Sequence, residues 1–191
     1  LRLFAALSAV ALAAIAALTL AAPYRLSRFT SWLDPNADRL GDGWQLIQGQ
    51  YALGTGGWWG VGLGASREKW GSLPEAHTDF IFSVIGEELG LIGTIMVLIL
   101  FGVIAFVAFR LVQKSTDTFI RLASAGIGTW IVAQAIVNIG AVLGLLPITG
   151  VPLPLVSYGG SSLVPLLLSL GILLSFTRNA TDPAPVVAEE K

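Results

Sequence analysis

The segment from Leu89 to Phe109 contains no charged residue and has about the 20 residues that a helix needs to cross a hydrocarbon core of about 30 Å. Two further apolar stretches, Leu3 to Ala22 and Leu122 to Leu146, are also long enough. A fourth, Leu163 to Phe176, is too short alone and must extend into the Pro- and Gly-rich stretch of residues 147–162. Irregular backbone at that depth survives only where protein or a water-filled cavity satisfies its polar groups.

The composition agrees with a membrane protein. Charged residues make up 12% of the chain, against roughly 25% in ordinary globular domains, and the mean hydropathy is +0.77. A soluble fold of 191 residues cannot hide so much apolar surface, whereas lipid accepts it. We therefore expect an all-α polytopic membrane protein with about four transmembrane helices, a long extracytoplasmic loop and a broken last helix.

The first apolar stretch has a second interpretation as a signal peptide, with Arg2 before it and small residues at Ala21 and Ala22. It is longer than the roughly 7–15 residues usual for the apolar part of a signal peptide. Because three more apolar stretches follow, a transmembrane helix is favoured. The chain starts at Leu1 and its only methionine is Met96, so we expect an N-terminal portion to be missing.

The residue inventory excludes several kinds of chemistry. The chain has no cysteine and one histidine, which excludes disulfides, iron–sulfur clusters, thiol catalysis and an ordinary zinc site. With 11 basic and 12 acidic residues, there is no positive excess to neutralise a nucleic acid. No cofactor is therefore expected, and the involvement of a divalent cation is undetermined.

The long loop, residues 24–76, contains five of the six tryptophans. Tryptophan prefers the headgroup region, where its ring is partly apolar and its N–H stays hydrated. We therefore expect this loop to lie against the membrane, with a short interfacial helix over Gln45 to Leu53.

Basic residues suggest an orientation. Arg110, Lys114 and Arg121 lie between the second and third stretches, which places this connection and both termini in the cytoplasm. The 24–76 loop then lies outside, although Arg25 and Arg28 argue weakly against this. The tail, residues 178–191, is expected to be a disordered cytoplasmic segment.

Four carboxylates gather where the long loop meets the second apolar stretch. A capping-box pattern from Ser72 to Glu75 predicts a helix from residue 73, which would put Glu75 and Asp79 on one face. Glu87 and Glu88 follow at the membrane boundary, and Arg67 and Lys69 precede the group. Carboxylates entering a low-dielectric region tend to have raised pKa values, which suits a general base.

Structural roles remain open for each of these residues. Glu75 can simply complete the capping box, Asp79 can stabilise a helix start through the helix dipole, and Glu87 and Glu88 can be interfacial residues in contact with headgroups. His77, the only histidine, is better suited to hydrogen bonding than to metal binding.

Two further features are less specific. The glycines between Gly54 and Gly64 match no P-loop and no dinucleotide fingerprint; they can present N–H groups to a pyrophosphate, form a flexible lid, or allow close backbone packing. Gln134 and Asn138 share a helix face within the third apolar stretch, where hydrogen bonding between helices is their expected role.

Three ordered blocks resemble the SEDS family of bacterial shape, elongation, division and sporulation proteins. They are GWQLIQGQYALGTGG at 43–57, LPEAHTDFIF at 73–82 with GEELG at 86–90, and GLLPITGVPLPLVSYGGSS at 144–162. The family has about ten membrane helices, so the resemblance makes residues 1–177 the C-terminal part of its membrane domain. Residues 62–70 and 86–90 look like the division branch, whereas 151–160 is closer to the rod-elongation branch.

The resemblance implies an enzyme that polymerises lipid II, a polyprenyl-pyrophosphate-linked disaccharide peptide, on the outer face of the bacterial cytoplasmic membrane. Asp79 matches the family's essential acidic residue, which implies that it is the base for the acceptor sugar's 4-hydroxyl. The other candidate substrate-binding residues lie in the same blocks or close to them: Glu75, His77, Arg67, Lys69, Glu87, Glu88, Ser157 and Tyr158.

Further expectations also follow from the resemblance. The implied partners are membrane lipid and a class B penicillin-binding transpeptidase, at the division septum. A lipid II flippase and a non-catalytic scaffold are the alternative functions. The charged residues crowd one membrane edge and are absent from the first, third and fourth apolar stretches, which favours chemistry at the outer face over flipping.

Overall fold

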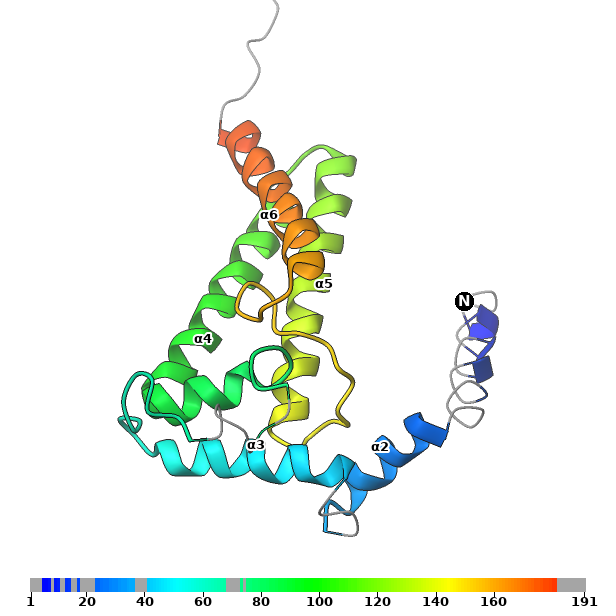
Figure 1. Ribbon diagram of the computed structural model, residues 1–191. Helices are drawn as coiled ribbons and strands as arrows, with labels where there is room; N and C mark the ends of the chain where they lie inside the picture. The colour runs from blue at the N-terminus through cyan, green and yellow to red at the C-terminus, as the bar shows by residue number, and fades with distance from the viewer. Residues whose placement is uncertain are drawn as a thin grey trace, which may run out of the picture.

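A computed structural model describes residues 5–7, 9–10, 13–14, 17, 23–36, 41–67, 73 and 75–181. Five helices are bounded within this part of the chain: α2 Pro23–Leu33, α3 Asp42–Gly56, α4 Ile81–Lys114, α5 Thr118–Val142 and α6 Gly160–Thr181. The described residues form no strand, so the expected all-α class is confirmed. Figure 1 shows α4, α5 and α6 standing together, with α3 running across one end of the α4–α5 pair.

Three of these helices are long and apolar enough to cross a membrane: Ile81–Lys114, Thr118–Val142 and Gly160–Arg178. They correspond to the second, third and fourth apolar stretches. Asp117 caps the start of α5, where its carboxylate accepts a hydrogen bond of 2.7 Å from the Phe119 N–H. The expected first span, Leu3 to Ala22, lies mostly outside the described residues, as does the tail after residue 181.

The prediction of a helix from residue 73 is wrong. Residues 75–80 form a turn, and α4 begins only at Ile81. Glu75 has a φ of 55°, in the left-handed region, so it cannot continue a right-handed helix. Its carboxylate instead accepts a hydrogen bond of 2.7 Å from the Thr78 hydroxyl. The capping-box partner, Ser72, lies outside the described residues.

The expected helix over Gln45 to Leu53 is confirmed within α3, while α2 was not predicted. Side chains of both helices fix the polypeptide that follows α5. Trp32 Nε1 donates to the Gly144 carbonyl at 2.8 Å, and Gln50 Nε2 donates to the Leu143 carbonyl at 3.4 Å. The long loop is therefore a folded part of the membrane domain rather than a separate unit.

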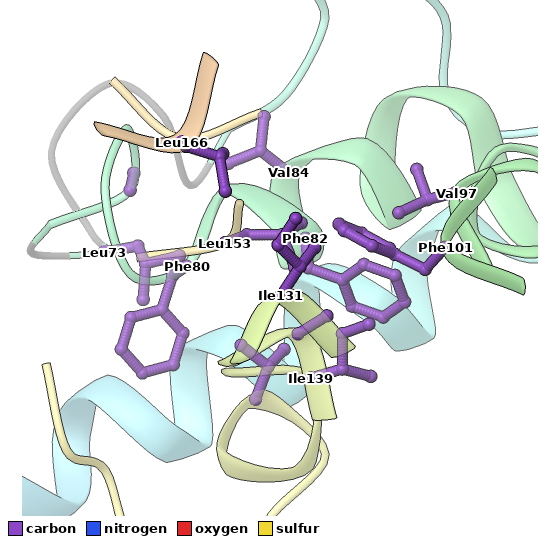
Figure 2. Close-up of a cluster of buried hydrophobic side chains, with 13 residues drawn as sticks. Leu73, Phe80, Phe82, Val84, Val97, Phe101, Ile131, Ile139, Leu153 and Leu166 are labelled. Carbon is purple, nitrogen blue, oxygen red and sulfur yellow. The ribbon is translucent and has the colours of Figure 1, made fainter. Parts of the chain in front are cut away.

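The buried core joins the turn before α4 to the three membrane helices. Phe80 is 1% exposed and Ile131 fully buried, and Figure 2 shows the surrounding cluster. The cluster includes Leu73, Ala76, Phe80, Phe82, Val84, Val97, Phe101, Ile131, Ala135, Ile139, Val142, Leu153 and Leu166. Since Phe80 follows Asp79 directly, burial of this ring fixes the backbone that carries the candidate base.

The segment between α5 and α6, residues 143–159, is irregular and returns from the α3 end of the bundle to the start of α6 (Figure 1). Two of its carbonyls are satisfied by polar side chains of α5: Gln134 Nε2 donates to Pro152 at 2.9 Å, and Asn138 Nδ2 donates to Val151 at 2.7 Å. The expected extension of the last helix is confirmed, because α6 begins at Gly160. Gln134 and Asn138 bond to irregular backbone rather than to another helix, which corrects the role expected for them.

Candidate functional site

The turn that carries Asp79 is fixed from two directions. Asn138 Nδ2 donates to the Asp79 carbonyl at 2.8 Å, and Ser157 Oγ donates to the Thr78 carbonyl at 2.6 Å. The Tyr158 N–H donates to the His77 carbonyl at 3.0 Å. Main-chain carbonyls of residues 77–79 are thus held by α5 and by the 143–159 segment. Such support from rigid elements keeps a reactive side chain in place.

The Asp79 carboxyl group is half-buried at the edge of this turn. Burial raises its pKa above the usual value, the Glu75 carboxylate raises the pKa further, and the Arg28 guanidinium lowers it. The net effect is an upward shift. A carboxyl group with a raised pKa holds a proton more readily than an ordinary aspartate, which is the property required of a general base.

Arg28 of α2 is a site residue that the sequence reasoning missed. Its Nη1 donates to the Ile148 carbonyl at 3.4 Å. A Cβ placed on Gly150 would lie 3.4 Å from Asp79 Oδ2 and 3.6 Å from Arg28 Nη1, so both groups approach the same side of that glycine. The available signal was the position of Arg28 on the side that the positive-inside rule assigns to the exterior, where a basic residue needs a separate explanation.

A groove opens beside the same turn. It has a volume of about 690 Å³ and is lined by His77, Ile81, Leu163 and residues 155–160. The His77 side chain is exposed, and Tyr158 is 83% exposed. The groove therefore offers an imidazole and a phenol together with apolar side chains in its lining.

Ser157 lies beside this groove, but its hydroxyl is used internally. Ser157 is 7% exposed; its Oγ accepts from the Leu153 N–H at 2.7 Å and donates to Thr78 at 2.6 Å. The hydroxyl therefore ties the 143–159 segment to the Asp79 turn, and a substrate contact by Ser157 stays a prediction.

Glu87 belongs to a second cluster, at the junction of the long loop and α4. It is 2% exposed, and its carboxylate accepts hydrogen bonds from Ser66 Oγ at 2.5 Å and from the Arg67 N–H at 3.0 Å. Glu87 is thus a buried latch for the loop rather than a headgroup-facing residue, which corrects the interfacial alternative. The latch orders the main chain at Arg67, whose side chain is exposed, while Lys69 lies outside the described residues.

The glycines of the loop pack against a break in α4. Gly90 has φ 65° and ψ −159°, so the helix is interrupted there. The Val61 N–H donates to the Glu87 carbonyl at 2.9 Å and the Gly62 N–H to the Glu88 carbonyl at 3.1 Å. Of the three roles considered for the glycines, close backbone packing is observed at Gly56 and Gly60, where a Cβ would collide with the carbonyls of Gly86 and Glu88. A Cβ at Gly54, Gly57, Gly62 or Gly64 would meet no atom within 4 Å. The N–H groups of residues 60, 61 and 62 all have partners within the chain, so they are not available to bind a pyrophosphate.

The structure thus assembles Asp79, Glu75, His77, Ser157 and Tyr158 around one turn and adds Arg28 to them. Arg67 and Glu87 belong to the latch, and Glu88 contacts the loop at the break in α4 through its main-chain carbonyl, which accepts from the Gly62 N–H. Among the described residues, no three His, Asp or Glu side chains are grouped as they would be to hold a metal ion.

Comparison with known proteins assigns the chain to a family. The cell cycle protein family that includes FtsW, RodA and SpoVE matches residues 1–182. Stage V sporulation protein E of Bacillus subtilis is 46% identical over 175 residues, covering 92% of this chain and 48% of that protein. A probable peptidoglycan glycosyltransferase FtsW of Tolumonas auensis is 47% identical over 192 residues, covering 98% of this chain and 50% of that protein.

A probable peptidoglycan glycosyltransferase FtsW of Mycobacterium tuberculosis is 44% identical over 188 residues, covering 98% of this chain and 36% of that protein. The chain spans about half the length of the first two relatives. One solved chain, described under "Structural coordination of polymerization and crosslinking by a peptidoglycan synthase complex", has a TM-score of 0.69 and 34% identity, covering 94% of this chain and 49% of that chain. The chain therefore belongs to the FtsW, RodA and SpoVE family of cell cycle proteins, the SEDS family, and is a multi-pass membrane protein with its all-helical fold.

Proposed function

We propose that this chain carries the acceptor-activating part of a peptidoglycan glycosyltransferase, which polymerises lipid II into glycan strands on the outer face of the cytoplasmic membrane during cell division. The observation that carries the proposal is Asp79, a half-buried carboxyl group with a raised pKa on a turn fixed by Asn138 and Ser157. The names of several relatives as probable peptidoglycan glycosyltransferases support this reaction class, and their name FtsW supports the division branch over the rod-elongation paralogue.

In the proposed reaction, Asp79 removes the proton from the 4-hydroxyl of the acceptor sugar as its oxygen attacks the anomeric carbon of the donor. The new bond joins the acceptor oxygen to that carbon, and the bond from the carbon to the polyprenyl pyrophosphate breaks. The pyrophosphate leaves with the electron pair, and the proton remains on Asp79 until solvent removes it. A base whose pKa lies closer to neutral than an ordinary aspartate's transfers this proton efficiently.

The surroundings suggest how the substrate is held. The groove beside the turn offers His77 and Tyr158 to polar parts of a sugar, next to an apolar wall. Glu75 is exposed beside Asp79 and is a candidate contact for the same sugar. The exposed Arg67 side chain, together with Lys69, is a candidate for binding the departing pyrophosphate, because guanidinium and ammonium groups stabilise developing phosphate charge.

The proposal needs no cofactor for the proton transfer, and a divalent cation at the pyrophosphate would be detected as loss of activity on chelation. The proposed partner is a class B penicillin-binding transpeptidase, and the proposed location is the division septum. The structural relative in a peptidoglycan synthase complex supports a partner of this kind.

The test is glycan polymerisation from purified lipid II by the longer protein together with its transpeptidase. Wild type is compared with Asp79→Asn and with Asp34→Asn, which alters an exposed carboxylate in the turn after α2. The expected result is polymer from wild type and Asp34→Asn and none from folded Asp79→Asn.

Two other outcomes would redirect the assignment. Normal polymerisation by Asp79→Asn would remove Asp79 as the base and bring Glu75 forward. Absence of polymer from folded wild type would favour a lipid II flippase, to be tested by translocation of labelled lipid II in vesicles, or a scaffold role if no translocation follows.

A further inference from the structure

The loop that leaves α3 exposes large apolar side chains that the proposed chemistry does not use. We call residues 57–64 the Trp loop. Trp58 is 71% exposed, Trp59 82% and Leu63 80%. Moreover, the sequence from Trp44 to Ser66 contains no charged residue. An exposed apolar patch of this kind marks an interaction surface.

The backbone of the Trp loop is bound to the broken part of α4. The Leu91 N–H donates to the Gly57 carbonyl at 2.9 Å, while the Val61 and Gly62 N–H groups donate to Glu87 and Glu88. Figure 1 shows the loop beside the end of α4 that meets α3. These bonds replace the helical bonds that Gly90 interrupts, so the loop has a defined height along the membrane helix.

Two more backbone groups of the Trp loop, the Gly60 N–H and the Gly62 carbonyl, have partners within the chain. The Gly60 N–H donates to the Gly56 carbonyl at 2.8 Å, and the Ala65 N–H donates to the Gly62 carbonyl at 3.2 Å. An irregular segment can lie in a region of low water content only when its polar backbone groups have partners in the protein. The N–H groups of residues 60–62 and the carbonyls of Gly57 and Gly62 meet this requirement.

The height of the loop can be derived from α4. The helix has 34 residues and carries Arg110 and Lys114 at its far end. A hydrocarbon core of about 30 Å takes roughly 20 helical residues. Counting back from Phe109 along the uncharged run, the other boundary falls at Leu89 and Gly90, which is where the helix breaks and the Trp loop is attached.

We propose that the Trp loop is a membrane contact in its own right, with Trp58, Trp59 and Leu63 placed at the boundary between the headgroups and the acyl chains of the bilayer that α4 crosses. Leu89, Leu91 and Ile92 of α4 are 40%, 40% and 47% exposed and continue the same apolar surface. Tryptophan is enriched at this depth because its ring is apolar and its N–H reaches water. The contact holds the α3 end of the domain at a fixed height and does not depend on the proposed glycosyl transfer.

Spin labelling measures this depth directly. The chain has no cysteine, so single cysteines can be introduced into the longer protein after replacing any cysteine of its remaining part. Trp59→Cys and Leu63→Cys report on the loop. Ile99→Cys, on an exposed position of the membrane-crossing part of α4, and Thr116→Cys, in the exposed α4–α5 connection, are the matched controls for lipid and water.

In lipid nanodiscs, collisions of the spin label with oxygen and with a water-soluble nickel chelate are compared. We expect the oxygen-to-nickel ratio at positions 59 and 63 to lie between the ratios at 116 and 99, several-fold above the value at 116. A ratio equal to that at 116 would place the loop in water and overturn the proposal. Low collision rates with both reagents would overturn it as well, because the loop would then be covered by another protein segment.

A second measurement leaves both positions apolar. Brominated lipids quench tryptophan fluorescence by contact, so Trp58→Phe combined with Trp59→Phe should remove a quenchable component that Trp44→Phe, at a half-buried position on α3, leaves in place. Unchanged quenching after the double replacement would contradict the proposed contact even if a cysteine variant failed to fold.

Discussion

Arg28 and Asp79 come from different parts of the chain and approach the same side of Gly150, where an added Cβ would lie 3.6 Å from Arg28 Nη1 and 3.4 Å from Asp79 Oδ2. The φ of Gly150 is 72°, so this position favours glycine for its backbone as well. Because Gly150 has no side chain, the Arg28 guanidinium and the Asp79 carboxyl group can both approach it. The positive charge of Arg28 lowers the pKa of Asp79, which burial and Glu75 raise.

Replacing Arg28 should change the pH dependence of the proposed reaction. Without the guanidinium, the pKa of Asp79 rises further, so a smaller fraction of the carboxyl groups is ionised at a given pH. We expect the acid limb of kcat/KM to move to higher pH in Arg28→Gln, with about a tenfold loss on that limb for each pH unit it moves. Glycan polymerisation measured from pH 5.5 to 9 checks this.

The other charged group that acts on the Asp79 carboxyl is Glu75; residues 143–157 contain no titratable side chain. Arg28→Lys should retain most of the wild-type profile, and Arg121→Gln, at the far end of the bundle, all of it. Equal losses in Arg28→Gln at every pH would show that Arg28 acts on the structure and not on the ionisation of Asp79.

Asp79→Asn should raise the stability of the protein at neutral pH. The folded pKa of Asp79 is above its ordinary value of 3.8, so the carboxyl group favours folding below that value and loses this contribution as the pH rises through the folded pKa. Asparagine does not ionise and avoids the loss. Because the group is only half-buried, we expect a gain of about 1 kcal/mol or less.

Thermal unfolding in detergent at pH 7.5 and pH 4.5 tests this, with the larger gain expected at the higher pH. A variant that melts below wild type at pH 7.5 would show that the carboxylate makes a stabilising contact there. Loss of polymerisation with a gain of stability would separate a catalytic role from a structural one.

The membrane helices could be predicted from the sequence because their signal is local. The uncharged run after Leu89 is visible without any partner, and α4, α5 and α6 follow the predicted stretches. The break at Gly90 could not be predicted in the same way, because it depends on hydrogen bonds to residues 57–62 of a distant loop. The start of α4 was misplaced for a related reason, since the left-handed φ of Glu75 has no marker in the residue type.

The candidate site residues that lie close together in the sequence could be predicted, whereas those that come from distant elements could not. Asp79, Glu75 and His77 lie in one short block and share one turn, so the neighbouring polar residues together with the resemblance of that block to the SEDS family were sufficient to nominate them. Arg28 reaches the turn from α2, and Asn138 from the interior of α5, where it was assigned to helix contacts. A hydrogen bond from a side chain to a carbonyl far away in the sequence leaves no periodic pattern from which it could be predicted.

Gly90→Ala should destabilise the protein. A Cβ at Gly90 would collide with the backbone of Trp58 and Gly60, and the φ of 65° is unfavourable for alanine. The loop would have to leave the break in α4, which would lose three backbone hydrogen bonds, for an expected cost of about 2 kcal/mol or more. Gly102→Ala, in the same helix, is the matched control because its Cβ would meet no atom within 4 Å.

Thermal unfolding of the two glycine variants measures the difference. Gly102→Ala should be neutral or slightly stabilising, because alanine favours a helix over glycine by about 1 kcal/mol. Equal unfolding temperatures for the two variants would mean that α4 tolerates a continuous helix at Gly90 and that the loop is not needed to satisfy it.

Asn138→Leu should reduce both stability and activity, because one amide joins the turn of Asp79 to the 143–159 segment. Asn138 is 3% exposed, and its Nδ2 donates to the Asp79 carbonyl at 2.8 Å and to the Val151 carbonyl at 2.7 Å. Leucine keeps the number and branching of the side-chain heavy atoms but leaves two carbonyls without this donor, at an expected cost of about 2–4 kcal/mol. Gln134→Leu removes a single bond to Pro152 and should cost about half as much.

The two variants should also differ in activity. Since, of these two residues, only Asn138 contacts the residue that carries the proposed base, kcat should fall much more in Asn138→Leu than in Gln134→Leu at a temperature where both are folded. Equal kcat values would mean that the turn keeps Asp79 in position without the amide.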